Sequence, residues 1–282
     1  MQIQKYSVIG FPIGHTMSPF IHSRLFELSG IRAEYSVMEI TPETLPKKFE
    51  ELKQLAGFNI TIPHKQAIIH FLDKLDGSAA EYGAVNTVKC SDITIGYNTD
   101  AFGFIKALDI AGIKLNGSVA ICGCGGVART IAYKALQAGC QLTFAVRESD
   151  MGTARLLKSQ LEGKFEKAKI DVCPLEDFAG QYSLLINATP VGMHPNSGEM
   201  PVSIDQLRNC SAVFDAVYNP GETMLLKNAK ALGLKTVGGM PMLVWQAVKA
   251  HEIWYNASFR LSDIESLIEE ADAQMQRRFN NG

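Results

Sequence analysis

Short apolar runs alternate with longer amphipathic segments along most of the chain. In the first part, the pattern predicts strands over 5–10, 34–40 and 57–62, helices over 19–29 and 64–75 and after Thr41-Pro42, hairpin strands over 84–89 and 94–97, and a helix over 101–111. Ser18-Pro19 has the form of a helix N-cap followed by proline, and Gly30 ends the same helix. Such alternation of strands and helices is typical of an α/β fold with largely parallel strands.

A second series of strands and helices follows the turn at Asn116-Gly117. The pattern predicts strands over 119–121, 141–146, 169–173, 182–187, 212–216 and 235–237, with helices over 127–139, 151–161, 222–232, 241–256 and 262–279. The last two helices have no strands of their own and could cover the first domain. We therefore expect a domain of residues 1–100, completed by 240–282, and a Rossmann-like doubly wound domain over 101–239.

Size and charge narrow the classes of function. With 282 residues, of which 46% are hydrophobic and 20% charged, the chain has enough apolar content for two cores. A net charge of -2 and a pI near 6.3 argue against nucleic acid or an anionic membrane as the partner, and favour small molecules. The chain begins without an apolar leader and has no apolar run of about eighteen residues, which favours a cytoplasmic protein.

Cysteine and histidine residues do not indicate a metal site. The six cysteines are scattered and show no zinc spacing, so buried reduced thiols are expected. His22 and His251 lie within predicted helices without a paired ligand, which favours packing or solvation. No metal is predicted.

The stretch from Ser118 to Ala128 carries the clearest motif. An apolar run reaches Gly123, Gly125 and Ala128, and a helix follows, which gives the order strand, glycine turn, helix. In that context G-x-G-x-x-A is the dinucleotide fingerprint, because the glycines permit a tight turn and a close approach of the pyrophosphate. The free N–H groups of the helix start would face the phosphates.

Two residues have the chemistry of proton transfer, and each also has a simpler interpretation. Asn59 and Thr61 share one face of a strand, and Lys65 falls in the first turn of the helix that is predicted next. The helix dipole there disfavours a charged lysine, which would suit a proton donor; otherwise Lys65 is a solvated surface lysine. Asp100 precedes a helix, where an aspartate most often serves only as a cap.

Together these segments resemble the shikimate dehydrogenase family over nearly the whole chain. The motifs that carry the resemblance are Gly10-Phe-Pro-Ile-Gly-His-Thr-Met-Ser-Pro19, Asn59-Ile-Thr-Ile-Pro-His-Lys65, Gly83-Ala-Val-Asn-Thr87, Gly96-Tyr-Asn-Thr-Asp100, the glycine turn, Asn187-Ala-Thr-Pro-Val-Gly-Met193, Asp215-Ala-Val-Tyr-Asn-Pro220 and Gly239-Met-Pro-Met-Leu-Val-Trp-Gln246. The resemblance implies an α/β substrate-binding domain and a Rossmann-like domain that binds NADP.

The implied activity is the reversible NADPH-dependent reduction of 3-dehydroshikimate to shikimate, in aromatic amino acid and chorismate biosynthesis. By resemblance, Lys65 and Asp100 are catalytic: Lys65 gives the proton, and Asp100 orients Lys65 and a substrate hydroxyl. The implied substrate-binding residues are Thr16, Ser18, Asn59, Thr61, Asn86, Tyr218 and Gln246. The implied cofactor-binding residues are Gly123, Gly125, Gly126, Val127, Ala128, Arg147, Thr189, Val217 and Gly239. A monomer or a homodimer is expected.

Three departures from the family pattern keep alternatives open. Thr16 stands where the family has serine, which would affect the preference between shikimate and quinate, and Ser23 replaces a frequent asparagine. Val146-Arg147-Glu148 stands where the family commonly has Asn-Arg-Thr. Arg147 would favour NADP, whereas Glu148 would repel a 2′-phosphate and makes NAD possible. The alternatives are therefore a quinate or dual quinate/shikimate dehydrogenase, using NAD or NADP, and a catalytically silent nucleotide-sensing module.

Overall fold

The computed structural model describes residues 3–14 and 16–279, and the chain divides into two compact units. The first comprises Met1–Gly103 and Val244–Ala271, and the second comprises Phe104–Leu243 and Asp272–Gly282. The division falls inside helices α4 (Asp100–Ile110) and α9 (Gly239–Tyr255). Residues 240–243 and 272–279 group with the second unit, whereas the sequence pattern assigned the whole of 240–282 to the first.

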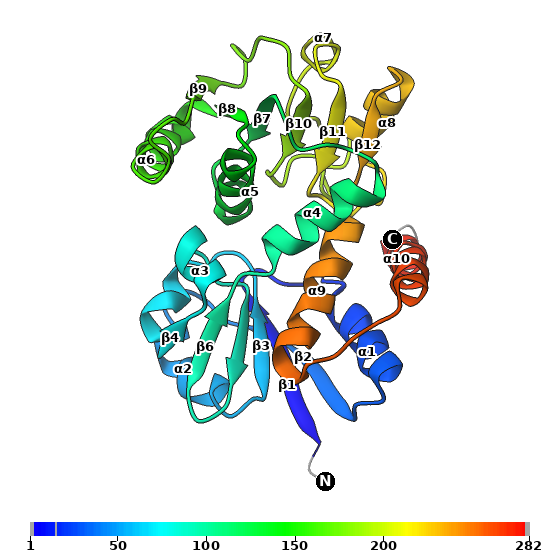
Figure 1. Ribbon diagram of the computed structural model, residues 1–282. Helices are drawn as coiled ribbons and strands as arrows, with labels where there is room; N and C mark the ends of the chain where they lie inside the picture. Colours follow the sequence, from blue (N-terminus) through cyan, green and yellow to red (C-terminus); the bar gives the residue numbers. More distant parts are fainter. Residues whose placement is uncertain (1–2, 15, 280–282) are drawn as a thin grey trace. The chain divides into compact units, whose positions relative to one another are not determined.

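A six-stranded sheet organises the first unit (Figure 1). Its strands are β1 (Gln4–Gly10), β2 (Ala33–Glu39), β3 (Gly57–Ile60), β4 (Lys74–Leu75), β5 (Thr87–Cys90) and β6 (Thr94–Tyr97). They lie in the order β2-β1-β3-β5-β6-β4. Strand β1 runs parallel to β2 and β3, while β5 is antiparallel to both β3 and β6 and forms the predicted hairpin. Strand β4 is parallel to β6, so three of the five pairings are parallel, as expected, and the β5–β6 hairpin makes the sheet mixed.

Alternating side chains of this sheet build two separate cores. The short helices of the unit are α1 (Ser18–Ser29), α2 (Leu45–Leu52), η1 (Ala67–Phe71) and α3 (Gly77–Tyr82). Phe58 and Ile60 pack in a cluster with residues of α2, η1 and α3, while Tyr6 packs with Phe26 of α1 and Trp254 of α9. Asn59 lies between Phe58 and Ile60 and pairs with Val8, so its side chain points to the face that α1 and α9 cover.

The predicted helix over 64–75 is wrong. Turns occupy 62–66, the five-residue 3-10 helix η1 follows, and Leu72 is already extended. Asp73 and Thr94 exchange hydrogen bonds of 3.1 and 2.8 Å, and Lys74–Leu75 pairs with β6, so strand pairing ends the helix. The predicted apolar stripe is nevertheless at least partly buried, because Ile68, Phe71, Leu72 and Leu75 all contact the core.

The second unit is a doubly wound parallel sheet. Its elements are β7 (Ser118–Cys122), α5 (Gly126–Gln137), β8 (Gln141–Val146), η2 (Glu148–Asp150), α6 (Met151–Glu162), β9 (Ile170–Pro174), β10 (Leu184–Asn187), α7 (Ile204–Leu207), β11 (Ala212–Asp215), α8 (Met224–Ala231), β12 (Lys235–Val237) and part of α10 (Leu261–Phe279). The strand order β12-β11-β10-β7-β8-β9 reverses direction between β7 and β10. Ligands of such sheets bind at that reversal, beyond the carboxyl ends of the strands.

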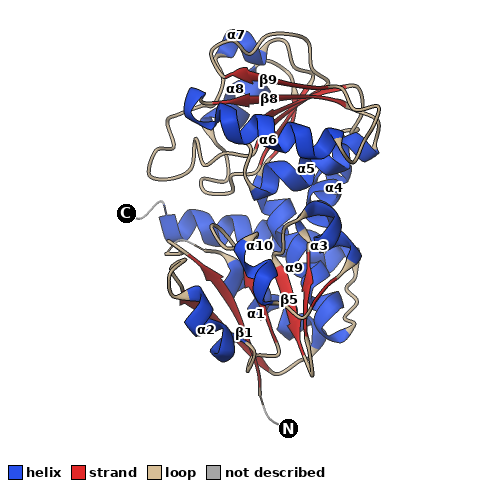
Figure 2. Cartoon of the chain, turned by 90° about the vertical axis from the view of Figure 1, so that its left-hand side faces the viewer, coloured by secondary structure: helices blue, strands red, loops and turns tan. Residues whose placement is uncertain are grey.

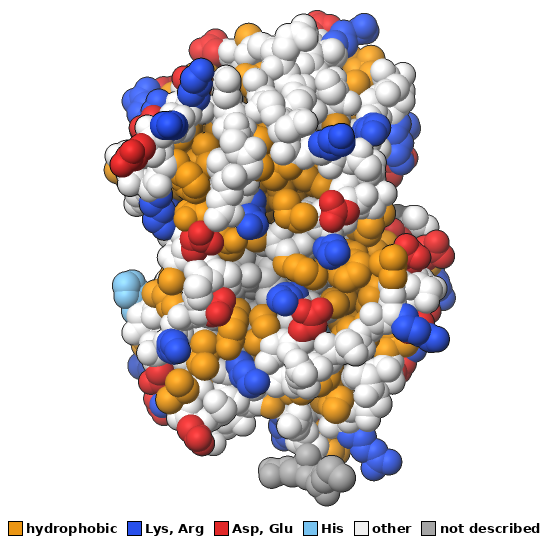
Figure 3. Space-filling view, in the orientation of Figure 1, with side chains coloured by type: hydrophobic (Ala, Val, Ile, Leu, Met, Phe, Trp, Pro, Cys, Tyr) orange, Lys and Arg blue, Asp and Glu red, His pale blue; other side chains and the backbone are white. Residues whose placement is uncertain are grey.

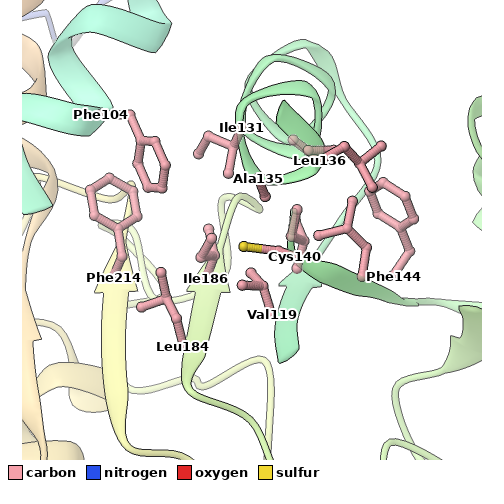
Figure 4. Packing of buried hydrophobic residues seen from close by; sticks show 14 of the residues in the cluster. Phe104, Val119, Ile131, Ala135, Leu136, Cys140, Phe144, Leu184, Ile186 and Phe214 are labelled. Atoms are coloured by element: carbon pink, nitrogen blue, oxygen red, sulfur yellow. The ribbon is translucent and has the colours of Figure 1, made fainter. Parts of the chain in front are cut away.

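Both faces of this sheet are covered, as the helices in Figure 2 show. One core packs strand residues such as Val119 and Ile186 against α4, α5 and α6, with Phe104 and Phe214 edge to face at 5.0 Å (Figure 4). The other packs Leu185 and Val213 against α7 and α8. Alternate residues of each strand thus serve opposite cores, which explains why the central strands are almost wholly apolar.

The molecular surface carries charges of both signs. On the face shown in Figure 3, lysine and arginine side chains are interspersed with aspartate and glutamate, without an extended basic area. Within the described part of the chain, no helix is both long and apolar enough to cross a bilayer.

Candidate active site

A lysine and an aspartate form a buried ion pair in the first unit. Lys65 follows β3 in the turn before η1, and its Nζ lies 2.7 Å from Oδ2 of Asp100, the first residue of α4. The side chains are 11% and 1% exposed. The argument that a helix dipole acts on Lys65 is wrong, since no α-helix begins there, and the surface-lysine interpretation is wrong as well.

Asn86 connects this pair to two further segments. Its Nδ2 lies 2.8 Å from Asp100 Oδ1, 2.9 Å from Thr99 Oγ1 and 3.0 Å from Oε1 of Gln246 on α9. Its Oδ1 accepts the backbone N–H of Thr99 at 2.7 Å, which fixes the orientation of the amide. Both carboxylate oxygens of Asp100 therefore bind side chains of other segments, an arrangement that the capping interpretation did not predict.

Asn59 and Thr61 extend the polar cluster along β3 and beyond its end. Asn59 donates from Nδ2 to Thr87 Oγ1 at 3.0 Å, and its Oδ1 accepts from the Tyr35 hydroxyl at 2.7 Å. Thr61 is half-buried against Gly10, where an added Cβ would come within 2.5 Å of the threonine methyl. A glycine at position 10 is thus required for Thr61 to sit where it does.

Thr16 and Ser18 lie together just before and at the start of α1. Thr16 Oγ1 lies 3.1 Å from Ser18 Oγ and accepts the Ser18 backbone N–H at 3.1 Å. Met17 is the N-cap, so the prediction of Ser18 as N-cap is wrong: the Ser18 hydroxyl bonds to Thr16 instead. His15, part of the same motif, falls outside the described residues.

Sequence reasoning missed Tyr35, which reaches from β2 across β1 to Asn59. Its position is that of an ordinary aromatic residue in an alternating strand, and no spacing signal connects it with a residue two strands away. Its ring stacks on His22 with centroids 4.2 Å apart and planes within 6°. Burial raises the pKa of Tyr35 well above that of a free phenol, so the hydroxyl keeps its proton.

His22 and His251 form a buried pair beneath this cluster. Their Nδ1 and Nε2 atoms lie 2.9 Å apart, and the other nitrogen of His251 bonds to the Tyr255 hydroxyl. Burial lowers the pKa of His22 well below its usual range and that of His251 to about 3. The packing interpretation of both residues is confirmed, and both imidazoles are neutral at pH 7.

This pair makes a specific contribution to acid sensitivity. When folding lowers the pKa of a histidine, the contribution of that histidine to the free energy of unfolding is fully present above its unfolded pKa, near 6.5. This contribution is progressively lost as the pH falls from there towards the folded pKa. Between pH 7.5 and 4.5 we expect His251 to cost roughly 3 kcal/mol of unfolding free energy. His251→Phe should be less stable at pH 7.5, because His22 and Tyr255 lose a partner, yet should lose less stability on acidification.

Urea unfolding of the wild type and of His251→Phe at pH 7.5 and 4.5 measures how much unfolding free energy each protein loses on acidification. Burial raises the pKa values of Asp215 and Asp272 to about 6, which stabilises the fold as the pH falls. These opposite effects are common to both proteins and cancel in the comparison. Equal losses for the two proteins would show that His251 does not titrate as its burial requires.

The dinucleotide motif of the second unit has the predicted geometry. Gly123 has φ +98°, and a Cβ there would meet the Thr189 methyl at 2.9 Å. Gly125 is the N-cap of α5, and a Cβ there would meet nothing within 4 Å, so its backbone is open to a ligand. Gly126 and Val127 start the helix and Ala128 is fully buried. The turn fits a pyrophosphate next to free helix N–H groups.

Asn187 and Asp215 are the last residues of β10 and β11, and their side chains hydrogen-bond to each other and to the segments that follow. Asn187 Oδ1 accepts from the Thr189 hydroxyl at 2.6 Å, and Asn187 Nδ2 donates to Asp215 Oδ1 at 2.9 Å. The same carboxylate oxygen accepts the Val217 N–H at 3.0 Å. Gly239 donates to Val217 O at 3.1 Å, and a Cβ at Gly239 would lie 2.3 Å from the Ala216 carbonyl. Tyr218, half-buried, follows directly.

Arg147 and Glu148 follow β8 and are both exposed. Arg147 Nε donates to Asp150 Oδ2 at 2.8 Å, which keeps the guanidinium near the strand end. A surface cavity of about 550 Å³ lies beside them, lined also by Leu175, Met200 and Met224. Its size suits one nucleoside half of a dinucleotide.

Comparison with known proteins gives a consistent result. A family model for the shikimate dehydrogenase substrate binding domain matches residues 8–88. The shikimate dehydrogenase (NADP(+)) of Caldanaerobacter subterraneus subsp. tengcongensis is 36% identical over 260 residues, which cover 90% of this chain and 92% of that protein. That of Geobacillus kaustophilus is 36% identical over 271 residues, covering 94% and 98%.

Solved structures of shikimate dehydrogenases are also similar to this chain. Shikimate 5-dehydrogenase of Thermus thermophilus, in complex with NADP(H) and shikimate, superposes with a TM-score of 0.82 at 32% identity, over 95% of this chain and 100% of that one. The enzyme of Listeria monocytogenes with shikimate and NAD gives 0.83 at 31%, covering 94% and 96%. The 5-ketofructose reductase of a Gluconobacter strain gives 0.80 at 29%, covering 95% and 99%. This chain therefore belongs to the shikimate dehydrogenase family.

Proposed function

We propose that this chain catalyses the reversible, NADP-dependent reduction of 3-dehydroshikimate to shikimate, a step of aromatic amino acid and chorismate biosynthesis. The observation that carries the proposal is the buried Lys65–Asp100 pair, set among amide and hydroxyl groups in a chain of this family. A module that only sensed nucleotides would have no use for a proton donor at the substrate-binding end. The pair therefore favours an enzyme over the silent module.

Lys65 transfers the proton of this reaction. Bound NADPH supplies the hydride to the ring carbonyl carbon. Lys65 Nζ donates a proton to the carbonyl oxygen as negative charge develops there, and takes it back in the reverse direction. Asp100, at 2.7 Å, holds the ammonium in place, and Asn86 at 2.8 Å holds Asp100. The chain's own contribution is orientation and proton supply.

Hydroxyl and amide groups of the first unit recognise the substrate. We assign the carboxylate to the hydroxyls of Thr16 and Ser18, which lie 3.1 Å apart and can donate side by side. We assign the ring hydroxyls to the remaining polar residues of the cluster, which are Asn59, Thr61, Asn86 and Gln246. The substrate contact of Tyr218 stays a prediction.

The second unit binds the dinucleotide. Gly123, Gly125, Gly126, Val127 and Ala128 provide the phosphate turn, and Thr189, Val217 and Gly239 line the neighbouring strand ends. Arg147 lies beside the exposed cavity and supplies a guanidinium that suits a 2′-phosphate. The relatives named for NADP(+) support NADP as the cofactor. NAD stays an alternative, because the Glu148 carboxylate would repel a 2′-phosphate. The structure of the Listeria monocytogenes enzyme also contains NAD.

Arg147→Ala tests the choice of cofactor. We expect the Kd for NADP+ to rise about tenfold and that for NAD+ to stay nearly unchanged, because an exposed charge-assisted hydrogen bond is lost only with NADP+. Glu148→Ala is the matched variant and should act oppositely, tightening NADP+ by removing a repulsive charge. Calorimetric titration with each nucleotide gives the four constants. Equal losses of both nucleotides in Arg147→Ala would exclude a role of Arg147 in reading the phosphate.

The first assay follows nicotinamide absorbance with purified protein. Shikimate and quinate are each offered with NADP+ and NAD+, and 5-ketofructose with NADPH. Turnover confined to shikimate with NADP+ supports the proposal. Quinate turnover would favour the dual quinate/shikimate dehydrogenase and make Thr16 the relevant departure, and 5-ketofructose turnover would replace the substrate. Nucleotide binding without any turnover would favour the sensing module.

We further propose a cytoplasmic enzyme that is a monomer or a homodimer. Size-exclusion chromatography with light scattering separates the two, since the chain mass is 30.8 kDa.

A further inference from the structure

A buried carboxylate lies at the carboxyl end of the central strands of the second unit. Asp215, the last residue of β11, is fully buried, as is Asn187 at the end of β10. Asp215 Oδ1 accepts from Asn187 Nδ2 at 2.9 Å and from the Val217 N–H at 3.0 Å. Oδ2 accepts from the Thr223 hydroxyl at 2.6 Å. All three donors are neutral groups.

The negative charge of Asp215 has no counterion. Among the described residues, no lysine, arginine or histidine forms a salt bridge with it. Lys230 of the neighbouring helix α8 is paired with Glu222 at 2.6 Å instead. Burial raises the pKa of Asp215 to about 6, so the carboxyl group is ionised at pH 8. Salt screens such a buried charge much less than a surface charge.

Hydrogen bonding alone does not explain an aspartate at this position. An asparagine could accept from Asn187 and Val217 with its oxygen, and could donate to the Thr223 oxygen with its amide. It would also avoid the free-energy cost of burying a carboxylate without a counterion. The charge itself is therefore the feature that needs a function.

The position of this charge in the sheet associates it with one half of a dinucleotide. The glycine turn and Arg147 belong to the half formed by β7, β8 and β9, and they suit the pyrophosphate and the adenosine side. In a doubly wound sheet each half serves one mononucleotide, on either side of the reversal of strand order. The half formed by β10, β11 and β12 therefore serves the nicotinamide nucleotide, and Asp215 ends its middle strand.

The charge of a nicotinamide ring depends on its redox state. The reduced ring is neutral, and the loss of a hydride, with its two electrons, leaves one positive charge on the oxidised ring. A fixed negative charge in this half of the sheet attracts the oxidised ring and not the reduced one. It also stabilises the positive charge that develops on the ring while the hydride leaves.

We propose that the buried charge of Asp215 makes the cofactor site selective for oxidised over reduced nucleotide, and thereby makes the bound reduced nucleotide a better hydride donor. This inference rests on the proposed function. It makes Asp215 a determinant of specificity for the redox state of the cofactor. Because Asp215 is fully buried, it acts through its charge and touches neither substrate nor cofactor.

Asp215→Asn tests the charge, because it keeps the size of the side chain and one acceptor oxygen. Calorimetric titration at pH 8, without substrate, gives the Kd for NADP+ and for NADPH. We expect the ratio of the NADP+ Kd to the NADPH Kd to rise about tenfold, mainly through weaker binding of NADP+. If both nucleotides weaken alike, or neither changes, Asp215 acts only through its hydrogen bonds and the proposal is wrong.

Thr223→Val is the matched control. It removes the hydrogen bond to Asp215 and the side-chain cap of α8, but it leaves the charge in place. Titration at pH 8, two units above the pKa of Asp215, keeps the carboxylate ionised after the loss of one donor. We expect both nucleotides to weaken alike, so that the ratio stays at the wild-type value. A tenfold rise of the ratio in this variant would assign the effect to the geometry of the segment and contradict the proposal.

The wild-type protein gives an independent measurement if Asp215→Asn does not fold. Between pH 8 and 5.5 Asp215 takes up a proton, and the ratio should rise about threefold. The Cys122 thiol, at the end of β7 beside Asn187, stays neutral because burial raises its pKa. Asp272, whose pKa is also about 6, approaches Gly221, so Asp272→Asn is titrated in parallel and should show the same rise. The 2′-phosphate is common to both nucleotides and cancels in the ratio.

These titrations separate the two levels of the proposal. A ratio that does not depend on pH in the wild type, or whose pH dependence disappears in Asp272→Asn, would overturn the role of Asp215. Wild-type protein that binds neither nucleotide would overturn the proposed function together with this inference. An enzyme that turns over shikimate, but whose ratio is unchanged in Asp215→Asn, overturns this inference alone.

Discussion

Lys65→Ala is expected to lower kcat about a thousandfold and to leave the affinity for NADP+ nearly unchanged. Proton transfer by a positioned side chain contributes between a hundredfold and ten-thousandfold, and no described residue other than Lys65 brings an ammonium to Asp100. The truncated side chain leaves space beside the carboxylate. Added methylammonium should therefore restore part of the activity, which a variant damaged only in its fold would not show.

Lys89→Met provides the control for this experiment. Lys89 belongs to the same unit and donates to the backbone oxygen of Ile253 at 3.0 Å, away from the ion pair. The Lys89→Met variant should keep kcat within a few-fold of the wild-type value, while its free energy of unfolding falls slightly. Steady-state rates at saturating shikimate and NADP+, with nucleotide titration alongside, give the comparison. A Lys65→Ala enzyme within tenfold of the wild type would remove Lys65 from proton transfer.

The fold follows from local pattern where the turn signals are clear. The predicted ranges of β8 and β12 coincide with the structure, because each strand begins two residues after a glycine with positive φ, Gly139 and Gly233 respectively. The segment after Pro63 is different. Ile68, Phe71 and Leu75 have helical spacing, yet Lys74–Leu75 pairs with β6 residues twenty-one positions further along the chain, and this pairing outweighs the local preference.

The candidate site likewise has parts that the local sequence predicts and parts that it does not. The glycine turn was predictable from residues alone, because strand, glycines and helix are contiguous in the chain. The Lys65–Asp100 pair was not, since the two residues are thirty-five positions apart and each has a common structural interpretation; only the family resemblance connected them. Tyr35 was missed altogether, because its partner Asn59 lies two strands away and neither residue type is unusual in a strand.

Asp100→Asn is expected to lower kcat between a hundredfold and a thousandfold and to destabilise the fold by about 3 kcal/mol. Asp100 accepts from Lys65 Nζ on one oxygen and from Asn86 Nδ2 on the other. An asparagine has only one acceptor oxygen and must present its NH2 group to one of these donors. Lys65, 11% exposed, then has a partly buried charge without its counterion.

This substitution separates the two interpretations of Asp100 that the sequence left open. Asparagine is as good a helix cap as aspartate, so a purely capping residue would tolerate the change with little effect. Asp73→Asn is the control, because Asp73 also accepts from a backbone N–H and a hydroxyl, both of Thr94, but lies outside the ion-pair cluster. In the double variant Lys65→Ala/Asp100→Asn, kcat should fall little below that of the slower single variant, since both changes remove the same unit. Additive losses would show that the two residues act independently, and Asp100 would then contribute something other than the orientation of Lys65.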